Sequence, residues 1–364
     1  MKTTTPNTPL QGAFFALTAA ALFGATMPFS KLLLGSLKPV LLAGLLYLGS
    51  GAGLAVWRWL RSRFKGSEAQ EAGLTGADLP WLAGAIFSGG VVGPVLLMVG
   101  LLLTPASSAS LLLNLEGVFT AVLAWFVFME NFDRRIALGM TAITAGGVLL
   151  SWSGQPALGV PWGVLAIIGA CLAWGIDNNL TRKVSAGDPL QIAMAKGLIA
   201  GAVNLIVALA AGTQRPSLPA TLLAALVGFF GYGVSLMLFV LALRHIGTAR
   251  TGAYFSFAPF VGAAISIAVL GDRLTPYFVT AAVLMGIGLF LHLTERHAHD
   301  HQHELLEHEH RHVHDEHHLH EHAAGVALGE PHSHSHQHDK VFHSHPHYPD
   351  IHHRHGHRDA KEER

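Results

Sequence analysis

The sequence predicts an all-α membrane protein of ten transmembrane helices, arranged as two inverted repeats of five and followed by a disordered, His-rich cytoplasmic tail. Three observations support this prediction. The 364 residues are 51% hydrophobic and 13% charged, with a mean hydropathy of +0.42, whereas soluble domains carry about 25% charged residues. Ten apolar runs are long enough to cross a bilayer, which takes about 20 residues. Part of the first half of the chain also recurs in the second half.

The apolar runs divide the chain into two sets of five predicted spans. They cover residues 12–34, 38–60, 80–103, 105–129 and 134–153, then 161–182, 189–212, 218–243, 250–270 and 275–294. Prolines inside runs, as at Pro28 and Pro94, are compatible with spans because neighbouring helices can satisfy the freed backbone groups. We therefore expect four regions, at 1–11 (cytoplasmic N-terminus), 12–153 (first repeat), 161–294 (second repeat) and 295–364 (tail).

The positions of Lys and Arg predict the orientation of the chain. If the N-terminus is cytoplasmic, the inner segments hold eleven basic residues and the outer turns hold three. Cytoplasmic loops of membrane proteins carry this kind of positive excess. An even number of spans then places both termini in the cytoplasm. We expect a multi-pass protein of the plasma (inner) membrane, with the lipid bilayer as its surroundings.

Two sets of residues recur at matching places in the halves. They are Phe23, Gly24 and Lys31, matched by Trp174, Gly175 and Arg182, and the turn acid Glu130, matched by Asp272. Each half then holds five spans, and an odd number of spans per repeat gives the two halves opposite topology. In proteins built this way, the substrate site lies near the middle of the membrane between the halves.

Two segments carry a resemblance to a known family. TPASSASLLLNLEGVFTAVLAWFVFMENFD, from Thr104, and TARTGAYFSFAPFVGAAISIAVLGDRLT, from Thr248, resemble spans of proteins with two EamA domains in the drug/metabolite transporter (DMT) superfamily. The resemblance covers about residues 12–294. Two departures stand out, because Gly117 occupies a position where the family usually has proline and Met129 one where it usually has glycine. The first predicts a straighter fourth span than the ninth, which keeps Pro259.

Glu116 is the charged residue near the middle of the fourth span. A charge inside lipid costs at least roughly 2.5–3.5 kcal/mol, so its presence needs a reason. Either Glu116 is a substrate-binding, gating or proton-carrying carboxylate, or it is hydrogen-bonded to a neighbouring helix for packing. Asn114 is a second candidate polar residue, but it lies on a different helix face from Glu116.

A second polar group lies in the sixth and seventh spans. Asp177, Asn178 and Asn179 are consecutive and cannot share one helix face, so at least one must face a cavity or another helix. Asp177 and Asn178 are candidate substrate-site residues. Lys196 can extend toward the cytoplasm, or pair with Asp177 or Glu116, as charges in membranes commonly do.

Aromatic residues and turn acids give further candidates. Tyr254 and Phe255 precede Pro259, at an expected helix break, and are predicted to line a cavity. Most tryptophans in or beside spans, a group that includes Trp174, are expected at the membrane interface. Glu130 and Asp272 are expected to cap helices or to pair with arginines in the turns.

The tail holds 23 of the 25 histidines, between His297 and His357. The candidate metal ligands are His297, His299, His301, His303, His332, His334, His336, His338, His352, His353, His355 and His357. Alternation at a spacing of two places imidazoles on one side of an extended chain, and imidazole suits Zn, Ni, Co or Cu ions. The competing hypothesis is an expanded low-complexity tail with incidental affinity.

The resemblance implies a secondary transporter that exports a small solute or metabolite by alternating access. Two alternatives remain open. One is a divalent Zn, Ni or Co exporter supplied by the tail, although the spans hold few metal ligands. The other is a metal-responsive membrane protein that transports nothing.

Several classes of function are disfavoured. No nucleophile-elbow, zinc-protease or phosphate-loop pattern occurs, so we expect neither an enzyme nor a required cofactor. The net charge of 0 gives no argument for nucleic acid. Cys171 is the single cysteine and is expected to be a small buried hydrophobe. The expected partners are a small-molecule substrate, lipid and metal ions, and a homodimer is left open.

Overall fold

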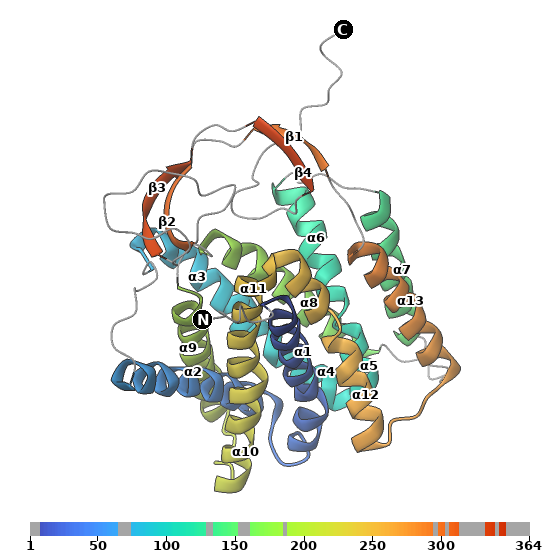
Figure 1. Cartoon of the computed structure of the whole chain (residues 1–364). Helices are drawn as coiled ribbons and strands as arrows, with labels where there is room; N and C mark the ends of the chain where they lie inside the picture. Colours follow the sequence, from blue (N-terminus) through green and yellow to red (C-terminus); the bar gives the residue numbers. More distant parts are fainter. Residues whose placement is uncertain are drawn as a thin grey trace, which may run out of the picture.

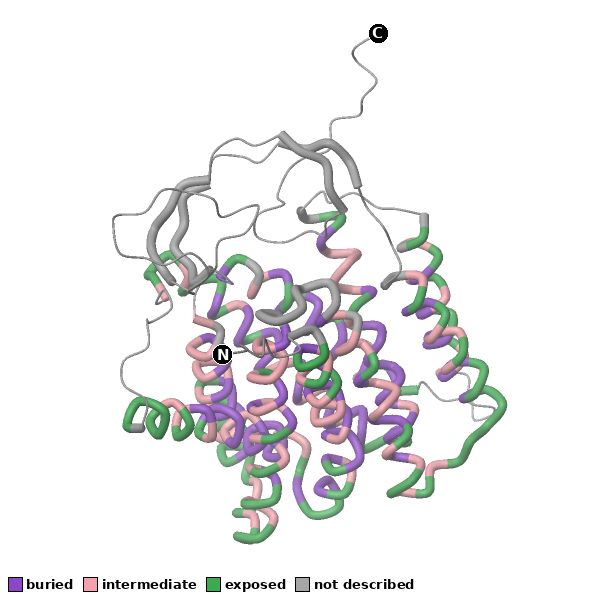
Figure 2. Tube along the Cα trace, in the orientation of Figure 1, coloured by how far each residue is buried: buried purple, intermediate pink, exposed green. Residues whose placement is uncertain are grey.

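The computed structural model describes most of the two halves and four short parts of the tail. The described residues are 8–64, 74–128, 134–151, 161–184, 188–293, 298–302, 306–312, 332–338 and 342–346. Within residues 8–293, the described secondary structure is helical throughout. Buried residues lie on the sides of these helices that face their neighbours, and exposed residues lie on the outer sides (Figure 2).

The helices follow the apolar runs. In the first half they are α1 (Thr8–Leu33), α2 (Pro39–Phe64), η1 (Gly76–Asp78), α3 (Leu79–Ala85), η2 (Ile86–Val92), α4 (Gly93–Leu103), α5 (Ala106–Leu112), α6 (Leu115–Phe128) and α7 (Arg134–Ser151). In the second half they are α8 (Trp162–Val184), α9 (Pro189–Ala210), α10 (Leu218–Gly228), η3 (Phe229–Val234), α11 (Ser235–Phe255), α12 (Ala258–Leu270) and α13 (Pro276–Leu293).

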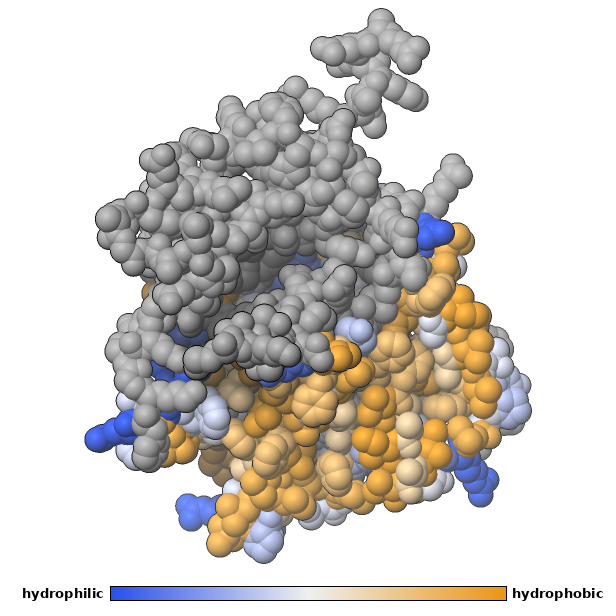
Figure 3. All heavy atoms as spheres, in the orientation of Figure 1, coloured by the Kyte–Doolittle hydropathy of each residue, from blue (hydrophilic) through white to orange (hydrophobic). Residues whose placement is uncertain are grey.

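These helices make the chain a membrane protein by length and composition. Among the described residues, seven helical runs are long and apolar enough to span a bilayer, and three further apolar helices are shorter, at Ala137–Ser151, Ala258–Leu270 and Pro276–Leu291. Apolar side chains cover the face of the helical bundle seen in Figure 3, and hydrophilic ones lie toward its edges. The seven runs and three shorter helices match the ten predicted positions, and the count of ten spans stays a prediction.

Helix packing is repeated between the halves. α1 packs against α11 and α12, and α8 packs against α4 and α6, which hold the matching places in the first half. The helices α2 and α9 pack on each other, as do α7 and α13, which lie together at one side of the bundle (Figure 1). The first helix of each half thus packs on the third and fourth spans of the other half, as expected for a repeated sequence.

Glycines bring α2 and α9 into close contact. A Cβ atom on Gly197 would lie 2.7 Å from the Gly51 backbone, and one on Gly51 would lie 2.7 Å from the carbonyl carbon of Gly197. Neither position leaves room for a side chain. Small residues of this kind allow helices to pack closely in lipid, where van der Waals contact drives association.

The fourth span is broken, as the ninth is, and the expectation that Gly117 leaves it straighter than the ninth stays a prediction. Between α5 and α6, the backbone N–H of Asn114 donates to Leu111 O at 3.1 Å, and the Asn114 side-chain amide donates to the same carbonyl at 2.8 Å. This local bond from the side chain competes with helical hydrogen bonding. In the ninth span the break falls at Ser256 and Phe257, where Pro259 is the second residue of α12 and has no N–H to donate.

One other boundary differs from expectation. The backbone stays helical through α11, so the predicted gap at 244–249 between the eighth and ninth spans is wrong. Hydropathy marks where apolar side chains stop, and helical hydrogen bonds can continue beyond that point. In addition, η2 and η3 are π-helical segments at matching places in the third and eighth spans. Such segments occur frequently at functional sites.

Four segments of the tail are strands, namely β1 (Ala298–Gln302), β2 (Leu306–His312), β3 (His332–His338) and β4 (Phe342–Pro346). β1 pairs antiparallel with β4, and β2 pairs antiparallel with β3. The expectation of a tail without regular structure is therefore wrong for these segments. The alternation of histidine at a spacing of two fits extended chain, in which side chains point to alternate faces.

Candidate functional site

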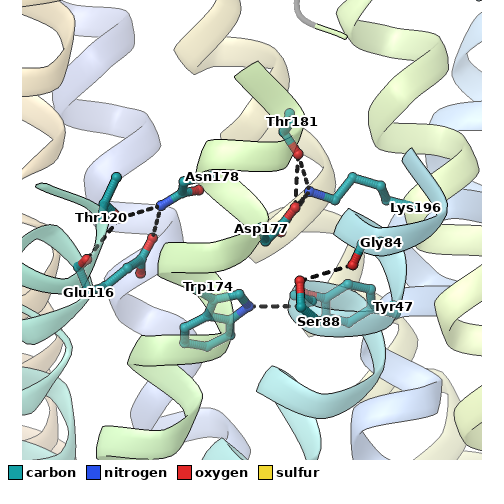
Figure 4. Close-up of polar contacts among 11 residues, drawn as sticks. Tyr47, Gly84, Ser88, Glu116, Thr120, Trp174, Asp177, Asn178, Thr181 and Lys196 are labelled. Atoms are coloured by element: carbon teal, nitrogen blue, oxygen red, sulfur yellow. Dashed lines mark hydrogen bonds and ion pairs between the residues drawn. The ribbon is translucent and has the colours of Figure 1, made fainter. Parts of the chain in front are cut away.

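Glu116 lies at the start of the half-helix α6, in its first turn. The free N–H groups and the dipole at a helix N-terminus favour a negative charge at this place. Asn178 of α8 donates its side-chain amide to Glu116 Oε1 at 2.9 Å (Figure 4). Glu116 is half-buried and Asn178 is exposed, so this pair is not enclosed by the described residues.

Thr120 and Asn179 complete the contact between α6 and α8. The Asn178 amide also donates to Thr120 Oγ1 at 3.1 Å, and the Thr120 hydroxyl donates to the backbone carbonyl of Glu116 at 2.8 Å. Asn179 donates to the backbone carbonyls of Thr120, at 3.1 Å, and Gly175, at 2.8 Å. These bonds fix the position of the Glu116 carboxylate relative to α8.

Asp177 points away from Glu116 and forms an ion pair with Lys196 of α9. Lys196 Nζ lies 2.6 and 2.7 Å from the two carboxylate oxygens. The Thr181 hydroxyl donates to Asp177 Oδ1 at 2.8 Å and accepts from Lys196 at 3.2 Å (Figure 4). Asp177 is buried, with 5% of its surface exposed, so each charge compensates the other.

The π-helical segment η2 presents backbone carbonyls to its neighbours. Gly89 O accepts from the Tyr47 hydroxyl at 2.9 Å and from Trp174 Nε1 at 2.8 Å, and Gly90 O accepts from the Asn204 amide at 3.1 Å. A Cβ atom on Gly89 would collide with the Asp177 carboxylate. This segment therefore joins α2, α8 and α9 beside the Asp177–Lys196 pair.

Three residues of this region were missed in the sequence. Trp174 was grouped with the aromatic residues of which most were expected at the membrane interface, whereas it is buried among helices and its indole is hydrogen-bonded. Tyr47 and Asn204 gave no signal of their own. The available signals were the adjacent glycines Gly89 and Gly90 within a span and the place of Trp174 in the repeat.

The other candidate residues lie in different surroundings. Asn114 is buried, and its amide lies 4.0 Å from Met285 Sδ besides the bond to Leu111 O, so it does not bond to Glu116. Tyr254 is half-buried, and no described contact joins it to Glu116. Its neighbour Phe255 packs its ring on Phe23.

Lys31 and Asp272 cap helix ends at one end of the bundle. Lys31 donates to the carbonyls of Leu101, Leu102 and Thr104 at 2.5–3.1 Å, at the C-terminus of α4. Asp272 Oδ2 accepts from the backbone N–H of Ser107 at 2.8 Å, in the first turn of α5, which confirms the predicted capping role. Glu130, its repeat partner, lies outside the described residues.

The predicted metal ligands of the tail are described only in part. His297, His303, His352, His353, His355 and His357 lie outside the described residues, and the others lie in β1 and β3 as backbone positions. The strand register pairs histidine with histidine, as in His308 with His336 and His310 with His334. Among the described residues, no group of three or more His, Cys, Asp or Glu is placed to hold a metal ion.

Both halves of the chain match one known protein family. The description "EamA-like transporter family" matches residues 10–152 and again residues 161–294. The chain belongs to this family. The family match and the apolar helices together make the protein a membrane transporter, with a small molecule as its substrate and a lipid bilayer as its surroundings.

Relatives within the family are transporters by name. An "Uncharacterized transporter" of Methanothermobacter thermautotrophicus is 28% identical over 295 residues, which cover 78% of this chain and 86% of the relative. The "Uncharacterized inner membrane transporter YedA" of Escherichia coli (strain K12) is 24% identical over 299 residues, 78% of this chain and 92% of that one. A "Probable amino-acid metabolite efflux pump" of Salmonella typhimurium is 26% identical over 208 residues, 52% and 68% respectively.

A solved structure shares the fold. The chain titled "Crystal structure of protein" superimposes with a TM-score of 0.56 at 16% sequence identity, covering 77% of this chain and 94% of its own. At this level of identity the likeness concerns the arrangement of the helices alone.

Proposed function

We propose that this transporter exports a small organic solute by alternating access, through a site between its two halves in which Glu116 is the central group. The observation that carries this proposal is the half-buried carboxylate at the break of the fourth span, held by Asn178 at 2.9 Å. Broken helices whose N-termini face the site are typical of secondary transporters. The salmonella relative, an efflux pump by name, supports outward transport.

A binding screen tests this site without knowledge of the solute. Purified full-length protein is heated with a panel of metabolites, and a solute that binds only the folded state raises the unfolding temperature. We expect at least one solute to stabilise the wild type and not Glu116→Gln. Thr280→Val is the control, because Thr280 is exposed on α13 and its described hydrogen bond is to Pro276 O of the same helix. If every stabilising solute acts equally on all three proteins, Glu116 is not part of a binding site.

We also propose that the tail is cytoplasmic and binds transition-metal ions. Directly opposed residues on antiparallel strands have Cβ atoms about 4.5–5.5 Å apart, and imidazole suits transition-metal ions. The pairing of His308 with His336 and of His310 with His334 supports this role. No contact among the described residues favours metal export, the alternative raised by the sequence, so it is not proposed.

Removal of residues 297–364 should abolish most of the zinc bound by the purified protein and leave stabilisation by the transported solute unchanged. The reason is that the two functions use different parts of the chain. Equilibrium dialysis with Zn²⁺ measures the first quantity and the unfolding temperature the second. Protease added to inside-out vesicles should remove the tail. Undiminished zinc binding after truncation, or protection of the tail, would contradict the proposal.

A further inference from the structure

Five aromatic side chains form a continuous row next to the Glu116 site. Tyr47 and Tyr232 have ring centroids 5.4 Å apart, Tyr232 and Phe23 5.7 Å, Phe23 and Phe255 5.5 Å, and Phe255 and Phe239 4.9 Å. The rings come from α2, η3, α1 and α11, in both halves of the chain. All five are half-buried, so they are neither sealed in the core nor fully on the surface.

The row is linked to α8 through the carbonyl of Gly89. The Tyr47 hydroxyl and the Trp174 indole donate to the same carbonyl, Gly89 O, and Trp174 lies one helical turn before Asn178 on the same side of α8. Glu116 is also close enough to interact electrostatically with the hydroxyls of Tyr47 and Tyr232. The carboxylate and the rings therefore border one region.

Glu116 is the charged group of this region that a ligand can neutralise. Lys196 is already paired with Asp177 at 2.6 Å, whereas the described hydrogen-bond partner of the Glu116 side chain is the neutral amide of Asn178. A cation therefore gains more from this site than an anion. Aromatic faces add to the attraction, because the negative face of a ring attracts a cation.

Tyr232 supplies a polar group within the row. Its hydroxyl is buried and makes no well-formed hydrogen bond among the described residues, and the Thr26 hydroxyl is its polar neighbour. Buried polar groups normally have partners, so a polar atom of a ligand would compete with Thr26 for this hydroxyl.

We propose that the solute is a protonated organic amine with a flat apolar body, its ammonium group at Glu116 and its body along Tyr232, Phe23 and Phe255. The proposal rests on the proposed function, since it names the class of solute for that site. The Glu116 carboxylate would bind the ammonium group of such a molecule, and the aromatic rings would contact its apolar body.

The test compares probes that share one body and differ in charge. Binding of phenethylamine, phenethyl alcohol and phenylacetate to the full-length protein is measured by calorimetry. We expect phenethylamine to bind at least about tenfold more tightly than the other two, a difference of about 1.4 kcal/mol. Glu116→Gln should remove this preference by weakening only the amine. A preference for the alcohol or the acid in the wild type would overturn the proposal.

Two substitutions on α1 test the aromatic wall. Phe23→Leu should weaken phenethylamine about fivefold or more, because it removes a ring of the row. Phe14→Leu is the matched control, since Phe14 is 65% exposed on the same helix and should have no effect. Tyr232→Phe removes a hydroxyl that makes no well-formed hydrogen bond among the described residues and should reduce only the affinity for tyramine, whose ring hydroxyl can bond to it. Equal effects of Phe23→Leu and Phe14→Leu would exclude the row as a binding wall.

The outcomes separate this proposal from the proposed function. If a solute from the screen requires Glu116 but phenethylamine does not bind, the amine class is wrong and the site between the halves stands. If no solute of any charge requires Glu116, the proposed site fails, and the amine proposal fails with it.

Discussion

Replacing Asp177 by asparagine is expected to destabilise the protein by about 3–5 kcal/mol, the usual cost of removing one partner of a buried ion pair. The substitution keeps the size of the side chain and the room left by Gly89, but it leaves the Lys196 ammonium inside the protein without its counter-ion. Lys196 Nζ now lies 2.6 Å from Asp177 Oδ1. The free energy of unfolding in mild detergent, from denaturant titration, measures the loss.

The double variant Asp177→Asn with Lys196→Met is the control for this prediction. It removes both charges and should recover most of the lost stability, because replacing a whole buried ion pair by neutral groups is often close to neutral. It should also keep its response to the transported solute. A folded double variant that no longer binds the solute would place Asp177 or Lys196 in the substrate site, as the sequence suggested.

Replacing Glu116 by glutamine is expected to slow solute export roughly 10- to 100-fold, which corresponds to the ~1.5–3 kcal/mol of a hydrogen bond to a charged group. If Glu116 carries the proton, acidifying the side toward which the solute leaves should accelerate export by the wild type, since a proton replaces the solute on the carboxylate. Glutamine cannot take up this proton, so export by the variant should not respond. Transport from solute-loaded proteoliposomes at several external pH values measures both effects.

The response to pH has other candidate groups, and the controls must separate them. Asp177 and Lys196 lie within electrostatic range of Glu116, and Tyr47 and Tyr232 face it from α2 and η3. Thr120→Val removes the hydroxyl that accepts from Asn178 and leaves every titratable group in place, so it should slow export without changing its dependence on pH. If Glu116→Gln still responds to the gradient, the proton carrier is another group, and Asp177 is the first to examine.

The sequence predicted the spans well because hydropathy depends on composition along the chain. It also singled out Glu116, because a carboxylate in lipid needs compensation wherever it lies. It did not identify Asn178 as the partner of Glu116 or choose between Asp177 and Glu116 for Lys196. Those pairings depend on how each helix is rotated about its axis, and packing against neighbouring helices sets that rotation.

Local backbone chemistry explains the remaining differences. The break at Asn114 comes from one side-chain amide that bonds to Leu111 O, an effect that a search for proline overlooks. The burial of Trp174 follows from the carbonyl that Gly89 presents in a π-helical segment, and hydropathy carries no signal for such a segment. In the tail, the spacing of histidines predicted extended chain, but strand pairing depends on contacts between distant segments.

The two parts of the fourth span, before and after its break, form hydrogen bonds with different helices. On one side, α5 is fastened to the second half, since the Ser110 hydroxyl donates to Pro259 O at 2.8 Å and Asp272 accepts from Ser107 N–H. On the other side, α6 is fastened to α8 through Asn178 and Asn179. One span is thus bonded to different helices on the two sides of its break, and rotation of the backbone at residues 113–114 would change the position of Glu116 relative to α5 and α12.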